Sequence, residues 1–115
     1  MIRPETAYKV LTADQMAALE AGSFAGAPVD VADGFIHLST GEQLTETVDR
    51  HFAGQSDLWI AAVDLGALGD AVRWEVSRGG DAFPHLYGPL TLDIVTAYGP
   101  LERDAGGGVR RPVAG

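Results

Sequence analysis

The alternation of apolar and polar residues predicts five β-strands. They cover residues 7–11, 35–39, 58–63, 72–76 and 94–98. Residues 58–63 are apolar at every position, which is typical of a central strand that is covered on both faces. Residues 72–76 alternate instead, so Val72, Trp74 and Val76 are expected to point inward, and Arg73 and Glu75 outward. Gly99-Pro100 interrupts the last strand, which indicates that it lies at the edge of a sheet.

Two helices are predicted from capping residues and from the spacing of apolar side chains. Thr12 and Gln15 form a capping-box pattern ahead of a helix over residues 13–21, and Gly22 supplies its C-terminal stop. A second helix is expected to open at Ser39-Thr40, again with acidic or amide partners three residues on. The buried stripe of the second helix recurs at four-residue steps and consists of Leu44, Val48 and Phe52.

Residues 23–34 and 77–90 show no period and are expected to be loops. Two helices cannot cover both faces of a five-stranded sheet as in a doubly wound fold. We therefore predict the α+β class, with a mixed, bent or split β-sheet and two main helices. The length of 115 residues fits a single domain, which we place at residues 1–104. Residues 105–115 are rich in glycine and arginine and are predicted to be a disordered tail.

Composition and charge limit the classes of function. The chain has no cysteine, which excludes disulfides, thiolate metal ligands and a cysteine nucleophile, and fits a reducing cytoplasm. Its longest strongly apolar run, residues 58–63, is too short to cross a bilayer. The formal net charge is −8, and such an acidic protein repels the phosphate backbone of DNA or RNA. We expect a cytoplasmic protein with a small-molecule ligand, and neither a nucleic acid nor a membrane as partner.

Two segments each embed a histidine among apolar residues: residues 34–40 (GFIHLST) and residues 83–88 (FPHLYG). An imidazole among apolar neighbours costs desolvation energy unless a partner hydrogen-bonds it. Because the chain has only three histidines, these two predict one polar pocket that contains His37 and His85. Tyr87 would share a side with His85 in an extended segment. The alternatives are a structural His37 bonded to a backbone carbonyl, and a packed turn in which His85 and Tyr87 cover the core.

Other residues carry weaker signals. Arg78, followed by two glycines, could bind a phosphate or carboxylate, and Glu75 could act as a carboxylate base or remain a solvated strand residue. His51 lies in the last turn of the second predicted helix, where it complements the helix dipole, and is given no function. The chain lacks a dinucleotide-binding fingerprint, a phosphate-loop motif, a His-Glu-x-x-His motif and a Gly-x-Ser-x-Gly motif. A serine hydrolase and a metal site are not predicted.

Four segments together resemble an uncharacterised bacterial family, domain of unknown function 952. They are residues 8–12 (YKVLT), 33–40 (DGFIHLST), 73–75 (RWE) and 83–88 (FPHLYG). The resemblance extends over residues 8–101 and implies a fold similar to that of the ADP-ribosyltransferases, which hold NAD between two splayed β-sheets. Leu38 departs from the related motif, which has glycine at that position, and no clear tyrosine-bearing second motif follows the second helix.

The resemblance also implies roles for individual residues. His37 would contact a ribose hydroxyl, Ser39 would support the site, Tyr87 would stack on nicotinamide, and Glu75 would be the catalytic glutamate. We take His37 and Glu75 as the catalytic candidates, and Ser39, Thr40, Arg78, His85 and Tyr87 as the ligand-binding candidates. The leading hypothesis is a nucleotide-like small-molecule site with NAD as a candidate cofactor, and with transfer or hydrolysis at the ribose C1′. The alternatives are a non-catalytic small-molecule or peptide-binding domain on a degenerate transferase scaffold, and a structural domain whose motifs only fill the core.

Overall fold

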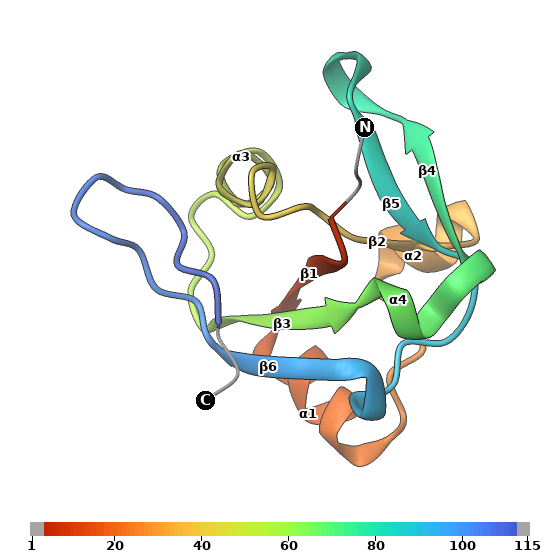
Figure 1. Cartoon of the computed structure of the whole chain (residues 1–115). Helices are drawn as coiled ribbons and strands as arrows, with labels where there is room; N and C mark the ends of the chain where they lie inside the picture. The colour runs from red at the N-terminus through yellow and green to blue at the C-terminus, as the bar shows by residue number, and fades with distance from the viewer. Residues whose placement is uncertain (1–3, 113–115) are drawn as a thin grey trace.

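The computed structural model describes residues 4–112, except for the side chain of Arg78. Six strands form two separate sheets, and short helices lie around them (Figure 1). The elements in chain order are β1 (Thr6–Thr12), α1 (Ala13–Ala21), α2 (Pro28–Asp33), β2 (Ile36–His37), α3 (Leu44–His51), β3 (Leu58–Asp64), α4 (Leu65–Leu68), β4 (Val72–Val76), β5 (Ala82–Leu86) and β6 (Val95–Pro100).

The first sheet has the strand order β1-β3-β6, and both pairings are antiparallel. The central position of β3 explains its uninterrupted apolar sequence, and β6 lies at an edge as expected. The second sheet has the order β2-β5-β4, also antiparallel throughout. The prediction of an α+β fold with a split sheet is therefore confirmed. The prediction of a mixed sheet is wrong, because every strand pairing within the described residues is antiparallel.

Strand β5 was expected to be part of a loop, and Pro84 is the reason for the error. A proline cannot donate to a strand ladder and normally argues against a central strand. Here the Pro84 carbonyl accepts the Leu38 amide at 3.1 Å, just beyond the end of the two-residue strand β2. In an antiparallel strand, the N and O of one residue face the same neighbouring strand. The nitrogen of Pro84, which carries no proton, therefore faces Leu38, which lies beyond the end of β2.

Residues 23–34 were expected to be irregular, but they include the helix α2. Its start and end follow ordinary capping rules: Pro28 occupies the first turn, and Gly34 ends the helix in a left-handed conformation with φ of 84°. The Asp30 carboxylate accepts the amide of Ala27 at 2.8 Å and so caps the helix from within. Helix α1 begins with the predicted capping box between Thr12 and Gln15.

The two sheets meet at β1. Tyr8 of β1 and Ser39, two residues after β2, exchange backbone hydrogen bonds of 2.7 and 2.9 Å. This bridge places the end of β2 against an edge of the first sheet. The predicted strand over residues 35–39 is thus a two-residue strand followed by a single bridge.

Two groups of buried apolar residues stabilise the fold. The first joins both sheets to α1 and contains Ala7, Leu11, Met16, Leu19, Ile36, Leu38, Ala61, Val63, Leu65, Leu86 and Leu90. The second lies beneath α3 and contains Val10, Leu44, Val48, Leu58, Ile60 and Val109. Val76 was expected to point inward but is 73% exposed. It lies at the end of β4, where the β4–β5 hairpin extends away from the first sheet (Figure 1).

Residues from Ala105 onward, for which the composition predicts disorder, are described as far as Pro112. Val109 is buried, its amide donates to the Thr45 hydroxyl at 3.0 Å, and it pairs with Arg103 in an isolated bridge. The predicted end of the tail, residues 113–115, lies outside the described residues. Of the helices between residues 4 and 112, none has the length and apolar character needed to cross a membrane.

Candidate functional site

His37 and His85 lie directly opposite each other on neighbouring strands. They are register partners in the β2–β5 ladder, and their ring centroids are 5.6 Å apart. Both histidines are among the residues that line one cavity of about 700 Å³. This larger cavity lies at the junction of the sheets. It is also lined by residues of β1, β5, α1, α2 and α3 and of the connecting segments: Tyr8, Lys9, Val10, Thr12, Gln15, Ala27, Pro28, Val29, Asp33, Leu38, Ser39, Thr47, His51, Phe52, Gln55, Ser77 and Phe83.

A buried ion pair supports the cavity from behind. The Lys9 ammonium lies 2.9 Å from Oδ2 of Asp30, and both side chains are almost fully buried. Lys9 also donates to the backbone oxygen of His37 at 3.1 Å. Burial lowers the pKa of Lys9, and the Asp30 carboxylate opposes this only in part. Burial by itself would raise the pKa of Asp30, but the Lys9 ammonium and the hydrogen bonds from His37 outweigh it and hold that pKa below its ordinary value.

His37 is held by carboxylates at both ring nitrogens. Nδ1 lies 2.7 Å from Oδ1 of the buried Asp30, and Nε2 lies 3.0 Å from Oδ2 of Asp33. The backbone amide of His37 donates to the same Asp30 oxygen at 3.0 Å. Asp30 and Asp33 both come from α2, so the helix that sequence analysis missed is the element that orients this histidine.

His85 is held by a carboxylate at one nitrogen only. Its Nδ1 lies 2.8 Å from Oε1 of Glu75 on β4, and the Tyr87 hydroxyl donates to that oxygen at 2.6 Å. These hydrogen bonds, that of Tyr87 first and that of His85 second, lower the pKa of Glu75, while the pKa of Tyr87 is raised by the same contact. No described residue hydrogen-bonds Nε2 of His85. His85 lines the larger cavity, and Nε2 is its ring nitrogen that no described residue occupies.

Phe35 connects the two histidines. Its ring stacks on His85 at a centroid distance of 4.1 Å and lies 4.5 Å from the ring of His37. Tyr87 lies 5.2 Å from the Phe35 ring and carries the Arg73 guanidinium over its own face at 4.5 Å. The strand register places the two imidazoles opposite each other, and the contacts with Phe35 further restrict the positions of both rings.

The structure brings several of the predicted site residues together, but not all of them. His37, Ser39 and His85 line the larger cavity, and Glu75 and Tyr87 reach it only through His85. The Ser39 hydroxyl is 2.8 Å from that of Thr47. Thr40, which is not among the described lining residues, instead exchanges hydrogen bonds with Gln43 ahead of α3. The side chain of Arg78 lies outside the described part of the structure.

Four contributors were missed by sequence analysis: Lys9, Asp30, Asp33 and Phe35. Lys9 carries the clearest signal, because a lysine within an apolar strand is rarely buried without a partner. The two aspartates lie in the segment just before His37, but their roles depend on the unpredicted α2. Phe35 is two residues from His37, and its ring lies against the His37 ring.

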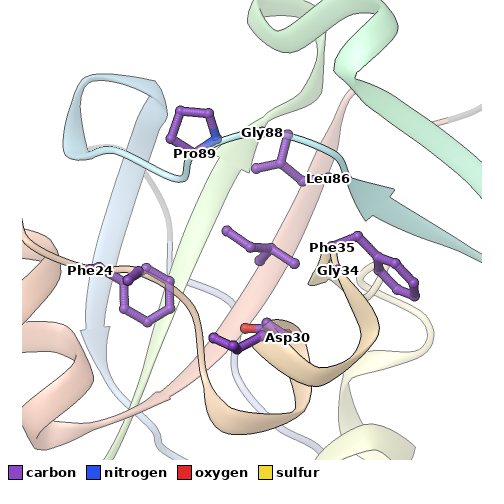
Figure 2. A pocket seen from close by; sticks show the side chains of 10 residues that line it. Phe24, Asp30, Gly34, Phe35, Leu86, Gly88 and Pro89 are labelled. Atoms are coloured by element: carbon purple, nitrogen blue, oxygen red, sulfur yellow. The ribbon is translucent and has the colours of Figure 1, made fainter.

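A smaller cavity of about 360 Å³ lies on another side of α2 and is mostly apolar. Figure 2 shows Phe24 and Phe35 on opposite sides of it, with Asp30 of α2 between them and Pro89 and Gly88 across from the helix. The Asp30 carboxylate is already occupied by Lys9, His37 and Ala27. The polar groups that could act on a ligand are therefore concentrated in the larger cavity.

Comparison with known proteins identifies the family. Residues 10–98 match a family described as a protein of unknown function, DUF952. The chain belongs to this family. The predicted resemblance to DUF952 is thus confirmed. No curated protein matches the sequence.

Three solved structures are similar to this DUF952 chain, and all are of protein CC0527 from Caulobacter crescentus, a structural genomics target. Its crystal structure is 46% identical, with a TM-score of 0.82 over 91% of this chain and 93% of that chain. A double mutant is 44% identical, with a TM-score of 0.81 and the same coverage. The solution NMR structure is 47% identical, with a TM-score of 0.76 over 92% of this chain and 91% of that chain. The likeness to ADP-ribosyltransferases stays a prediction.

The geometry of this DUF952 site allows two kinds of chemistry. An imidazole whose Nδ1 is fixed by a carboxylate can accept or donate a proton at Nε2, as His85 is placed to do. A second imidazole fixed between carboxylates can act as a hydrogen-bond donor and a positive charge, as His37 is placed to do. Within residues 4–112, no group of three or more histidine, aspartate and glutamate side chains is arranged to hold a metal ion.

Proposed function

We propose that this protein binds a nucleotide-like small molecule, with NAD as a candidate, in the larger cavity. The observation that supports this best is the shared cavity of His37 and His85, two rings from distant parts of the sequence. A volume of about 700 Å³ is within the ordinary range of small-molecule sites. The position of the cavity, where two separate antiparallel sheets meet, is consistent with the ADP-ribosyltransferase-like arrangement that the sequence resemblance implies.

The lining offers complementary surfaces to such a ligand. Tyr8, Phe52 and Phe83 supply aromatic surface for a planar base, and Ser39 and Thr47 supply a hydroxyl pair that can both donate and accept. In this proposal Ser39 and His37 contact ribose hydroxyls. Thr40 supports the turn before α3 through its hydrogen bonds with Gln43, and Arg78 is a candidate contact for a phosphate group beside Ser77.

The proposed reaction is hydrolysis or transfer at the ribose C1′. The bond from C1′ to the nicotinamide nitrogen breaks, and its electron pair leaves with nicotinamide. A water or acceptor hydroxyl forms the new C1′–O bond, and its proton passes to Nε2 of His85. Glu75 fixes the Nδ1 proton of His85 and stabilises the resulting imidazolium, so it acts through His85. Tyr87 shares the Glu75 oxygen and holds the carboxylate in place.

Isothermal titration with NAD and ADP-ribose, on the wild type and on His37→Ala and His85→Ala, tests this proposal. We expect binding to the wild type and at least tenfold weaker binding to each variant, because each removes a ring from the cavity wall. Tyr98→Phe is a matched control, since it removes a hydroxyl that contacts only Glu20 among the described residues. Equal heats in the wild type and in both histidine variants would exclude the site.

A second candidate is a non-catalytic domain that binds the same class of molecule. Glu75 favours it, because this carboxylate is not among the described residues that line the cavity and already accepts two hydrogen bonds. Chromatographic analysis of NAD after prolonged incubation separates the candidates. Nicotinamide formed by the wild type but not by His85→Ala supports catalysis, whereas bound but unchanged NAD supports a binding domain.

A further inference from the structure

Both ring nitrogens of His37 contact carboxylates. An ionised carboxylate only accepts hydrogen bonds, so a ring nitrogen in contact with one must carry a proton. Nδ1 of His37 meets Asp30 at 2.7 Å and Nε2 meets Asp33 at 3.0 Å. With both aspartates ionised, a protonated His37 ring donates at both nitrogens. His85 differs, because only its Nδ1 meets a carboxylate.

The two carboxylates that hold His37 are anchored very differently. Asp30 is 2% exposed, and its oxygens also accept from the Lys9 ammonium, the Ala27 amide and the His37 amide. Asp33 is 48% exposed at the last position of α2, and the contact with Nε2 is its one side-chain hydrogen bond to a described residue. Asp33 can therefore rotate away into solvent, whereas movement of Asp30 would leave the buried Lys9 ammonium without its charge partner.

Charges near the ring favour an anion once Asp33 has moved. The groups that face His37 are Asp30 and Asp33 from α2, Lys9 from β1, and His85 from β5. Lys9 and Asp30 neutralise each other, so a protonated His37 ring is the remaining positive group at this position. His37 is 31% exposed and lines the larger cavity, so its Nε2 proton is accessible to a bound molecule.

We propose that the Nε2–H of His37 is the oxyanion-binding donor of the larger cavity, and that Asp33 occupies it in the free protein as an internal competitor. A phosphate or carboxylate group of the ligand takes the place of the Asp33 carboxylate. The proposal deepens the proposed function by naming the chemistry of the ligand group at this wall. The proposal rests on the proposed function only in assuming that a ligand enters the larger cavity. The replacement of the Asp33 carboxylate is expected with any ligand that carries an oxyanion.

The test uses inorganic phosphate and ADP-ribose as anionic probes and adenosine as an uncharged one, with Asp33→Ala and Asp33→Asn variants. We expect about three- to tenfold tighter binding of both anions by Asp33→Ala, as an exposed ion pair of modest strength no longer has to be broken. Asp33→Asn keeps an acceptor without the charge and should fall between this variant and the wild type. Adenosine should bind all three proteins equally. Asp70→Asn removes an equal charge elsewhere on the surface and should leave all affinities unchanged.

Nuclear magnetic resonance of the ring nitrogens supplies a second readout. We expect the Nε2 signal of His37 to shift on addition of phosphate, because the phosphate takes the place of the Asp33 carboxylate at that nitrogen. An Nε2 signal that does not change on addition of phosphate, or anion affinities that are unchanged in Asp33→Ala, would overturn the proposal. If phosphate shifts Nε2 but neither NAD nor ADP-ribose binds, the oxyanion site stands and the nucleotide proposal fails. If NAD and ADP-ribose bind but phosphate does not shift Nε2, the nucleotide proposal stands and only the proposed role of Asp33 is rejected.

Discussion

Glu75 holds His85 through a contact of 2.8 Å between Oε1 and Nδ1, across neighbouring strands β4 and β5. The carboxylate fixes a proton on Nδ1 and thereby selects the chemical form of Nε2, the nitrogen without a partner among the described residues. The two histidines of the site are consequently not equivalent. His37 is held at both nitrogens as a donor, while His85 is held at one nitrogen and remains able to exchange a proton.

Replacing Glu75 with glutamine is expected to impair turnover more than binding. The glutamine amide can present either its oxygen or its NH2 group to Nδ1. The preference for the form of His85 that carries its proton on Nδ1 is therefore lost. Where NAD is turned over, we expect kcat to fall by about 10²- to 10⁴-fold, the range ascribed to a positioned acid or base, with a small change in KM. A normal kcat in Glu75→Gln would show that the carboxylate does not act through His85.

Tyr87→Phe is expected to shift the pH dependence of the site. The Tyr87 hydrogen bond is the largest cause of the lowered pKa of Glu75, so its removal raises that pKa. Glu75 then becomes protonated at a higher pH than in the wild type, and the acid limb of ligand binding or turnover should move to higher pH. Tyr98→Phe, whose hydroxyl bonds Glu20, is the control and should leave the profile in place. Superimposable profiles for the wild type and Tyr87→Phe would contradict the assignment.

Asp30→Ala is expected to be among the most destabilising single substitutions in the described chain. It leaves the buried ammonium of Lys9 without its charge partner and removes the side-chain cap of α2. Breaking a buried pair in this way typically costs about 3–5 kcal/mol of unfolding free energy. Urea denaturation measures the loss, with exposed Asp70→Ala as a control that should change stability by less than about 0.5 kcal/mol. A similar decrease in unfolding free energy in Asp30→Ala and Asp70→Ala would contradict the structural role of the buried Lys9–Asp30 pair.

Acid should destabilise the wild type through the same carboxylate. The pKa of Asp30 in the folded protein lies below its ordinary value, so the folded state binds this proton less readily than the unfolded state. The resulting stability is fully present above the ordinary aspartate pKa of about 3.9 and is lost as the pH falls through the lowered folded value. Unfolding free energies measured from pH 6 down to pH 2 should decline less steeply for Asp30→Asn. An equal decline would place the titrating groups elsewhere.

Much of the fold was predictable because its signals are local. The capping box at Thr12 and Gln15, the stripe through Leu44 and Val48, and the apolar run of β3 each reflect contacts within one element or burial on one face. Strand β5 was missed because Pro84 normally disfavours a central strand. The sheet accommodates Pro84 because β2 ends opposite it, and the end of β2 depends on the pairing of distant segments.

The candidate site was only partly predictable for a similar reason. His37 and His85 were expected to share a pocket, and the register of β2 with β5 brings them together. Their electrostatic difference depends on Asp30 and Asp33, which reach His37 only because α2 replaces an expected loop. The pairing of Lys9 with Asp30 joins residues 21 positions apart, and no local pattern indicates it.

The most direct test of the central claim is the response of the histidine rings to ADP-ribose, followed by long-range proton–nitrogen correlation spectra. We predict that the ring signals of both His37 and His85 shift together and saturate at one ligand concentration, because the rings border the same cavity. Saturation of the His37 and His85 signals at different concentrations, or the absence of any shift at millimolar ADP-ribose, would contradict a shared nucleotide site.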